Sequence, residues 1–110
     1  MLRSLARPEY LFRPRQIWRR LRHPWGFHLP PRAEVTLPWG WPLCIRTHET
    51  IGRLIWTFGV FDLPVTEVLW RLTGPGDIAV DAGANIGCMT CVLATRVGPT
   101  GRVLSFEPFP

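Results

Sequence analysis

Apolar residues along the chain recur at helical spacing in three segments. Their apolar positions are Ile51, Ile55 and Phe58 in the first, Val65, Val68, Leu69 and Leu72 in the second, and Met89, Val92, Leu93 and Val97 in the third. Gly59 ends the first predicted helix, and Asp62 before Pro64 starts the second. We expect the first two helices to cover a sheet.

Short apolar runs between these helices predict four strands. Residues 35–37 and 43–46 flank a proline-rich turn at 38–42, a pattern that favours a β-hairpin. The run at 77–80 is too short for a helix and predicts a buried strand that ends at Asp81. A last strand is expected at 102–106. These two strands and the helix between them predict a β-loop-α-β unit with parallel strands and a right-handed crossover.

Residues 1–32 differ in composition from the rest of the chain. They hold eight arginines and one glutamate, a net charge of +7, whereas residues 33–110 have a net charge of −2. Seven of the twelve prolines fall within the first 42 residues, and proline disfavours long regular structure. We therefore place a boundary near Arg32, with a basic arm at 1–32 and a partial α/β domain at 33–110.

A short basic amphipathic helix is predicted inside this arm. Its apolar positions are Ile17, Trp18, Leu21 and Trp25, arginines lie between them, and Pro24 ends the helix. We favour packing of this apolar face on the following domain. Weak contact with an anionic membrane surface or a partner is an alternative. Nucleic acid is not expected as a partner, because the chain has no motif of a known nucleic-acid module.

The apolar segments are too short for membrane insertion or secretion. The longest nearly apolar stretch, residues 54–61, is far below the roughly 20 residues of a membrane span, and residues 1–6 have no apolar core. We expect a cytoplasmic protein. An odd number of cysteines argues against a disulfide framework, so reduced thiols are expected.

The cysteines permit three interpretations. Cys88 and Cys91 have redox spacing at the start of a predicted helix, and adding Cys44 and His48 gives a zinc ligand set. Buried structural thiols on the helix are the interpretation we favour, because cysteine is among the most buried residue types. No metal site is therefore expected.

Two carboxylates follow the two predicted parallel strands. Asp81 ends the first and Glu107 follows the second, and ligands of open parallel sheets bind beyond these carboxyl ends. A carboxylate in the position of Glu107 can accept hydrogen bonds from both hydroxyls of a ribose. Between them, Gly83 and Gly87 bracket Asn85 in a loop that lets backbone groups approach a ligand. We expect these five residues to bind a nucleotide-type cofactor.

The acid at the loop entrance discriminates between cofactors. A nicotinamide dinucleotide places its pyrophosphate on such a loop, where Asp81 would repel it. S-adenosyl-L-methionine has no phosphate and carries a sulfonium and an ammonium, which Asp81 attracts. We therefore favour S-adenosyl-L-methionine, with the dinucleotide as the alternative.

The same residues resemble the S-adenosylmethionine-binding half of the FkbM-type methyltransferases. The resemblance covers roughly residues 59–110 and rests on DAGANIG at 81–87, then Thr90, Gly98, Gly101, Val103 and FEP at 106–108, with GVFD at 59–62 and PGD at 75–77 upstream. It implies a Rossmann-like class I methyltransferase fold, with Asp81 and the loop at the methionine moiety and Glu107 at the ribose. Cys88 departs from the family, which commonly has an aromatic residue there.

The resemblance also implies a reaction, methylation of a hydroxyl on a small molecule or sugar. A fold of this class needs roughly seven strands, and the present sequence supplies two of them. We therefore expect an N-terminal fragment or truncated product that binds the cofactor weakly. No catalytic residue is assigned.

Overall fold

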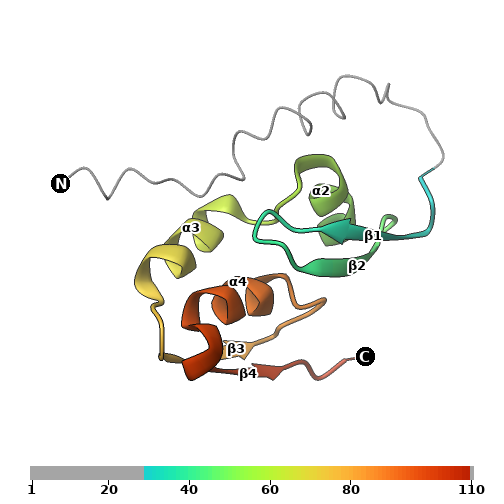
Figure 1. The fold of residues 1–110 in the computed structure, drawn as a ribbon. Coiled ribbons are helices and arrows are strands. Elements are labelled where there is room, and N and C mark those ends of the chain that lie inside the picture. Colours follow the sequence, from blue (N-terminus) through green and yellow to red (C-terminus); the bar gives the residue numbers. More distant parts are fainter. Residues whose placement is uncertain (1–28, 110) are drawn as a thin grey trace, which may run out of the picture. The chain divides into compact units, whose positions relative to one another are not determined.

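A computed structural model describes residues 29–109 as a small α/β fold (Figure 1). The amphipathic helix predicted around residues 17–25 lies outside the described residues. Of the basic arm at 1–32, the structure describes only residues 29–32. The chain divides into two compact units, Met1–Phe61 and Asp62–Pro110. Within 29–109 no helix is long and apolar enough to cross a membrane.

The first unit contains the predicted hairpin. Strand β1 (Arg32–Thr36) pairs antiparallel with β2 (Pro42–Arg46), so the prediction is confirmed, although β1 begins three residues before the expected strand. The polar residues of β1 fit the strand because they alternate with Ala33 and Val35, and they take the exposed positions. The turn closes through a 2.8 Å hydrogen bond from the Leu37 amide to the Trp41 carbonyl.

Helix α2 (Thr50–Phe58) packs on β2, as its apolar spacing predicts. Ile45 of β2 and Ile55 of α2 are almost fully buried. Gly59 ends the helix at φ 79°, and its amide donates to the Ile55 carbonyl at 2.7 Å. The predicted helix and its glycine stop are therefore confirmed.

The second unit contains the predicted β-loop-α-β arrangement. Strand β3 (Ile78–Ala82) and β4 (Arg102–Phe106) are parallel, in a register that pairs Ile78 with Arg102 and Ala82 with Phe106. Helix α4 (Cys88–Val97) contacts both strands, and the short 3₁₀ helix η3 (Gly98–Thr100) leads from it into β4 (Figure 1). Val92, Leu93 and Val97 of α4 are buried, as predicted.

Helix α3 (Leu63–Leu72) forms where predicted, but the expected burial of its apolar face is wrong. Leu72 is 80% exposed and Val65 and Val68 are also exposed, whereas Thr66 is fully buried. The reason is that α3 packs against α4 and does not cover the sheet. The Thr66 hydroxyl lies 3.8 Å from the Met89 sulfur on α4.

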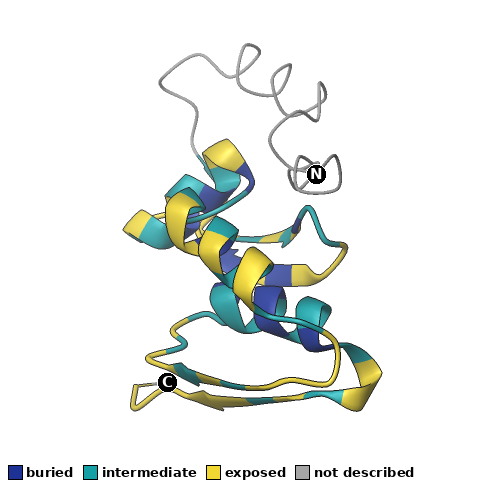
Figure 2. Ribbon diagram, turned by 90° about the vertical axis from the view of Figure 1, so that its left-hand side faces the viewer, coloured by how far each residue is buried: buried dark blue, intermediate teal, exposed yellow. Residues whose placement is uncertain are grey.

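The expectation of a buried β3 is also wrong. Ile78 is 73% exposed, and Val80 is exposed on the same face of the sheet with Leu104 and Phe106 of β4. Figure 2 shows the two strands coloured as exposed over most of their length. Helix α4 covers the other face, toward which Asp81 projects. Within residues 62–109 the parallel pair is therefore covered on one face only, whereas parallel sheets are usually covered on both.

Asp62 gives α3 its start, and its replacement is expected to weaken the second unit. Its backbone is left-handed at φ 48°, and its Oδ1 accepts from the Val65 amide at 3.3 Å. Asp62→Ala removes this cap and forces alanine into a left-handed conformation, so we expect a loss of about 1.5 kcal/mol in unfolding free energy. Urea unfolding followed by NMR signals of residues 62–109 measures it. Asp62→Asn keeps both properties and should stay near wild type; equal losses in both variants would contradict the capping role.

Candidate functional site

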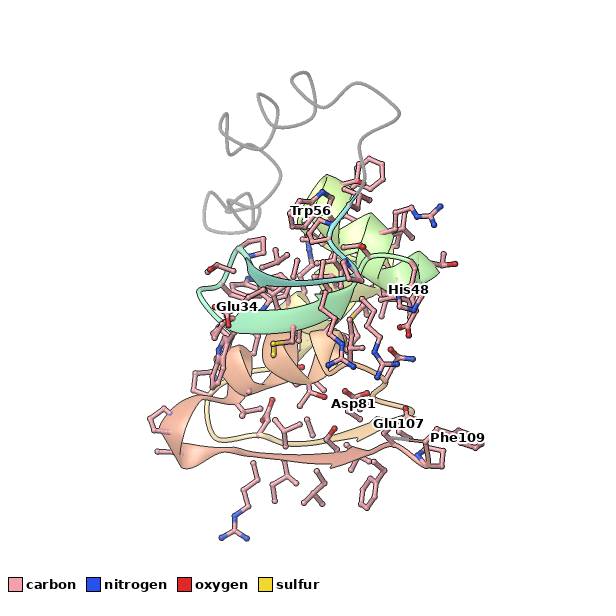
Figure 3. All side chains as sticks on the ribbon, turned by 90° about the vertical axis from the view of Figure 1, so that its right-hand side faces the viewer. Glu34, His48, Trp56, Asp81, Glu107 and Phe109 are labelled. Atoms are coloured by element: carbon pink, nitrogen blue, oxygen red, sulfur yellow. The ribbon has the colours of Figure 1, made fainter. Side chains whose placement is uncertain are left out.

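Asp81 and Glu107 lie at the same end of the parallel strand pair. Asp81 is the fourth residue of β3 and pairs in register with Ser105, and Glu107 directly follows β4. Both side chains appear at this end of the strands in Figure 3. The structure therefore brings together the two carboxylates that the sequence selects.

The loop between β3 and α4 has the backbone that its residues favour. Gly83, Asn85 and Gly87 all have positive φ, at 82°, 50° and 85°. Glycine adopts this region without steric cost, and asparagine tolerates it better than most residues. A Cβ added at Gly83 or Gly87 would meet nothing within 4 Å, so backbone conformation and not crowding by the described residues calls for glycine here.

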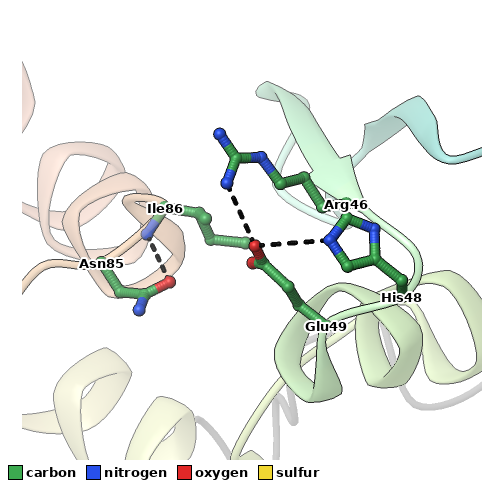
Figure 4. Close-up of polar contacts among 5 residues, drawn as sticks. All are labelled: Arg46, His48, Glu49, Asn85 and Ile86. Atoms are coloured by element: carbon green, nitrogen blue, oxygen red, sulfur yellow. Dashed lines mark hydrogen bonds and ion pairs between the residues drawn. The ribbon is translucent and has the colours of Figure 1, made fainter.

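Every backbone amide of the loop at 83–87 donates a hydrogen bond to an acceptor within the second unit. The amides of Gly83 and Ala84 donate to the Phe106 carbonyl at 2.8 and 3.0 Å. The Asn85 amide donates to Glu107 Oε2 at 2.7 Å. The Ile86 amide donates to Asn85 Oδ1 at 2.8 Å (Figure 4), and the Gly87 amide donates to the Ala84 carbonyl at 2.8 Å. These bonds tie the loop to the end of β4 and occupy the five donors that the loop itself could offer to a phosphate group.

Glu107 is held by two backbone amides. Its Oε2 accepts from Asn85, and its Oε1 accepts from Phe109 at 3.1 Å. Each carboxylate oxygen has a second acceptor position, so the group can still accept two further hydrogen bonds. The side chain is exposed to solvent. Its position and remaining capacity suit a ligand with two neighbouring hydroxyl groups.

Asp81 is half-buried and is bound through one oxygen. Its Oδ2 accepts from the Thr90 hydroxyl of α4 at 2.5 Å. The Thr90 hydroxyl also lies 3.0 Å from the Ser105 hydroxyl of β4. The side chain therefore has one oxygen fixed by α4, while Oδ1 has no hydrogen-bond partner among residues 29–109.

Sequence reasoning missed the hydrogen bonds that join Thr90 to Asp81 and to Ser105. The apolar pattern gives no role to either residue, and only the resemblance singles out Thr90. A signal was available for Ser105, because it is the one polar residue in the run Val103 to Phe106 and stands opposite Asp81 in the parallel register. That signal requires the register, which the apolar pattern alone does not supply.

The three cysteines are free thiols, and the structure does not support the redox interpretation of Cys88 and Cys91. Cys88 is buried and Cys91 is half-buried, and no disulfide joins Cys44, Cys88 or Cys91. Burial raises the pKa of the Cys91 thiol, which disfavours the thiolate that redox chemistry needs. In the part of the chain that the structure describes, no three His, Cys, Asp or Glu side chains are grouped to hold a metal ion.

His48 belongs to an exposed ionic group on the first unit. Glu49 Oε1 lies 3.2 Å from an Arg46 guanidinium nitrogen and 3.9 Å from His48 Nε2 (Figure 4). All three side chains are well exposed. Exposed pairs of this kind contribute little to stability, about 0–1 kcal/mol, and they indicate no ligand site.

The comparisons with known proteins add no assignment to this geometry. No protein-family model matches the chain, and no solved structure matches it. Function must therefore be argued from the residues at the end of β3 and β4.

Proposed function

We propose that the end of the β3–β4 pair binds S-adenosyl-L-methionine, as the cofactor-binding part of a Rossmann-like methyltransferase of the FkbM type. Asp81 faces the cationic methionine end of the ligand, and Glu107 accepts hydrogen bonds from the ribose hydroxyls. The loop at 83–87 lies between them. Support comes from the parallel β-loop-α-β unit with a carboxylate at each strand end.

The observation that carries the choice of cofactor is the use of all five loop amides within the protein. A dinucleotide site presents such amides to a pyrophosphate. Here they bond to Phe106, Glu107 and the loop itself, and two carboxylates flank the loop. A ligand with two phosphates would meet negative charge and no free donor among these five loop amides, whereas a sulfonium and an ammonium gain Coulomb attraction. This argues against the nicotinamide alternative.

Methyl transfer would require a nucleophile in line with the sulfonium methyl group, which is chiefly a matter of positioning. The resemblance suggests a hydroxyl on a small molecule or sugar as the acceptor. Asp81 and Glu107 hold the cofactor in this proposal, and neither is assigned as a base.

Binding can be tested by NMR titration of the chain with S-adenosyl-L-methionine, S-adenosylhomocysteine and NAD⁺. The described residues supply only two strand ends, so we expect a dissociation constant in the millimolar range for the first ligand. Amide shifts should concentrate at residues 81–90 and 105–109. S-adenosylhomocysteine lacks the sulfonium charge and should bind more weakly. Tighter binding of NAD⁺, or shifts that avoid these segments, would contradict the proposal.

Asp81→Asn gives this test a matched variant, because the amide preserves shape and removes the charge. We expect affinity for S-adenosyl-L-methionine to fall about tenfold, since the lost attraction to the sulfonium and ammonium is moderated by solvent. Affinity for S-adenosylhomocysteine should fall less, because it retains only the ammonium. Asp77→Asn, at the opposite end of the sheet, is the control and should leave both affinities unchanged. An equal loss of affinity for both ligands in Asp81→Asn would contradict an attraction between the Asp81 charge and the sulfonium.

A further inference from the structure

Three side chains from three elements form a directed hydrogen-bond chain beneath the proposed site. The Thr90 hydroxyl has one hydrogen, and it is donated to Asp81 Oδ2 because a carboxylate can only accept. The contact between Thr90 and Ser105 must then be donated by Ser105. The chain therefore runs from Ser105 on β4 through Thr90 on α4 to Asp81 on β3.

A second threonine on the same helix shows that this arrangement is specific to Thr90. The Thr95 hydroxyl donates at 2.8 Å to the carbonyl of Cys91, four residues earlier, which is the usual bond of a threonine inside a helix. Thr90 instead directs its hydroxyl across to the strand. The bond to Asp81 is charge-assisted, and such bonds are stronger than those between neutral groups.

We propose that Thr90 and Ser105 are positioning residues that hold the Asp81 carboxylate in one orientation, with Oδ2 engaged and Oδ1 left for a cationic group. That the cationic group is the sulfonium or ammonium of S-adenosyl-L-methionine rests on the function proposed above. The orientation itself does not depend on the ligand. A carboxylate fixed before binding loses less conformational freedom when the ligand arrives, which raises affinity.

The orientation can be measured without any ligand. Three-bond NMR couplings to the Asp81 carboxyl carbon report its χ1 angle, and the wild-type protein should show one rotamer. Thr90→Val removes the hydroxyl at nearly constant volume and should give averaged couplings. Thr90→Ser restores the donor and should restore one rotamer, and Ser105→Ala should give partial averaging. A single Asp81 rotamer in Thr90→Val would overturn the positioning role.

Ligand binding supplies the second measurement. Thr90→Val should lower the affinity for S-adenosyl-L-methionine about fivefold, which is the size expected for one net hydrogen bond. Its affinity for S-adenosylhomocysteine should fall less. Thr95→Val removes a hydroxyl from the same helix without touching Asp81, and it should preserve the ratio of the two affinities. An equal loss for both ligands in Thr90→Val would indicate general damage and would overturn the inference. If wild type binds neither ligand, the proposed function fails, and the couplings still decide whether Thr90 orients Asp81.

Discussion

Gly52→Ala is expected to destabilise the first unit by about 3 kcal/mol, although alanine is normally the better helix residue. Gly52 lies in the first turn of α2 and is buried. A Cβ at this position would lie 2.1 Å from the Arg46 carbonyl oxygen and 2.8 Å from its carbon. These are backbone atoms at the end of β2, so no side-chain rotation relieves the overlap.

The sign of the effect is what makes this variant informative. Helix propensity alone predicts a gain of about 1 kcal/mol for glycine to alanine in a helix. Steric overlap with the backbone of β2 outweighs that gain, because α2 must move away from the strand and expose Ile45 and Ile55. Amide hydrogen exchange of α2 and β2 measures the loss in this unit directly.

The control is Arg53→Ala, the next residue on the same helix, whose side chain is exposed. It should change stability by no more than about 0.5 kcal/mol. Protection of the α2 amides in Gly52→Ala that equals or exceeds wild type would show that α2 does not approach β2 as closely as described.

The elements of both units follow from local patterns that sequence reasoning can detect. Helix α2 ends at Gly59 and α3 begins at Asp62, because a left-handed glycine and a capping carboxylate act within one helical turn. Strand β4 has the predicted bounds, since two turns and an apolar run define it. Such signals depend on neighbouring residues only.

What sequence reasoning missed depends on contacts between distant residues. The apolar positions of α3 predict burial, but the pattern does not say which layers surround it, and Thr66 packs on α4 while Leu72 remains exposed. The same limit explains the exposed Ile78. Thr90 and Asp81 meet because α4 packs across β3, and the predicted crossover does not say which residue of the helix faces Asp81.

The candidate site, too, could be predicted from the sequence only in part. Asp81 and Glu107 could be predicted, because residues at the carboxyl ends of parallel strands reach one edge of the sheet. The bonding of the loop amides could not be predicted, since it requires the Phe106 carbonyl and Glu107 to approach residues more than twenty positions earlier. That bonding is also the basis on which we propose a cationic ligand and not a phosphate ligand.

Gly101→Ala is expected to destabilise the second unit by about 3 kcal/mol and to remove ligand-induced shifts together with the fold. A Cβ on Gly101 would lie 2.4 Å from the Val97 Cβ and 2.6 Å from the Asp77 carbonyl oxygen. The backbone of Gly101 is extended at φ −96°, so the effect comes from overlap and not from torsional strain.

The overlap falls where β3 and β4 begin to pair. The Asp77 carbonyl accepts from the Arg102 amide at 3.0 Å, and the nearby Val97 carbonyl accepts from the Gly76 amide at 2.9 Å. Moving Gly101 away from both carbonyls breaks these bonds and separates the first residues of the parallel pair. Since Asp81 and Glu107 are held at the other end of the same pair, loss of pairing also separates the two carboxylates.

Gly74→Ala is the matched control for Gly101→Ala, because its added Cβ would meet only Asp77 Oδ2, at an ordinary 3.7 Å. Urea unfolding, followed by NMR signals of residues 62–109, should show a stability near wild type for Gly74→Ala and a much lower midpoint for Gly101→Ala. Equal midpoints for the two variants would mean that Val97, Gly101 and Asp77 are not packed as described. Loss of ligand shifts with unchanged stability would instead place Gly101 at the binding site, against the assignment to Asp81 and Glu107.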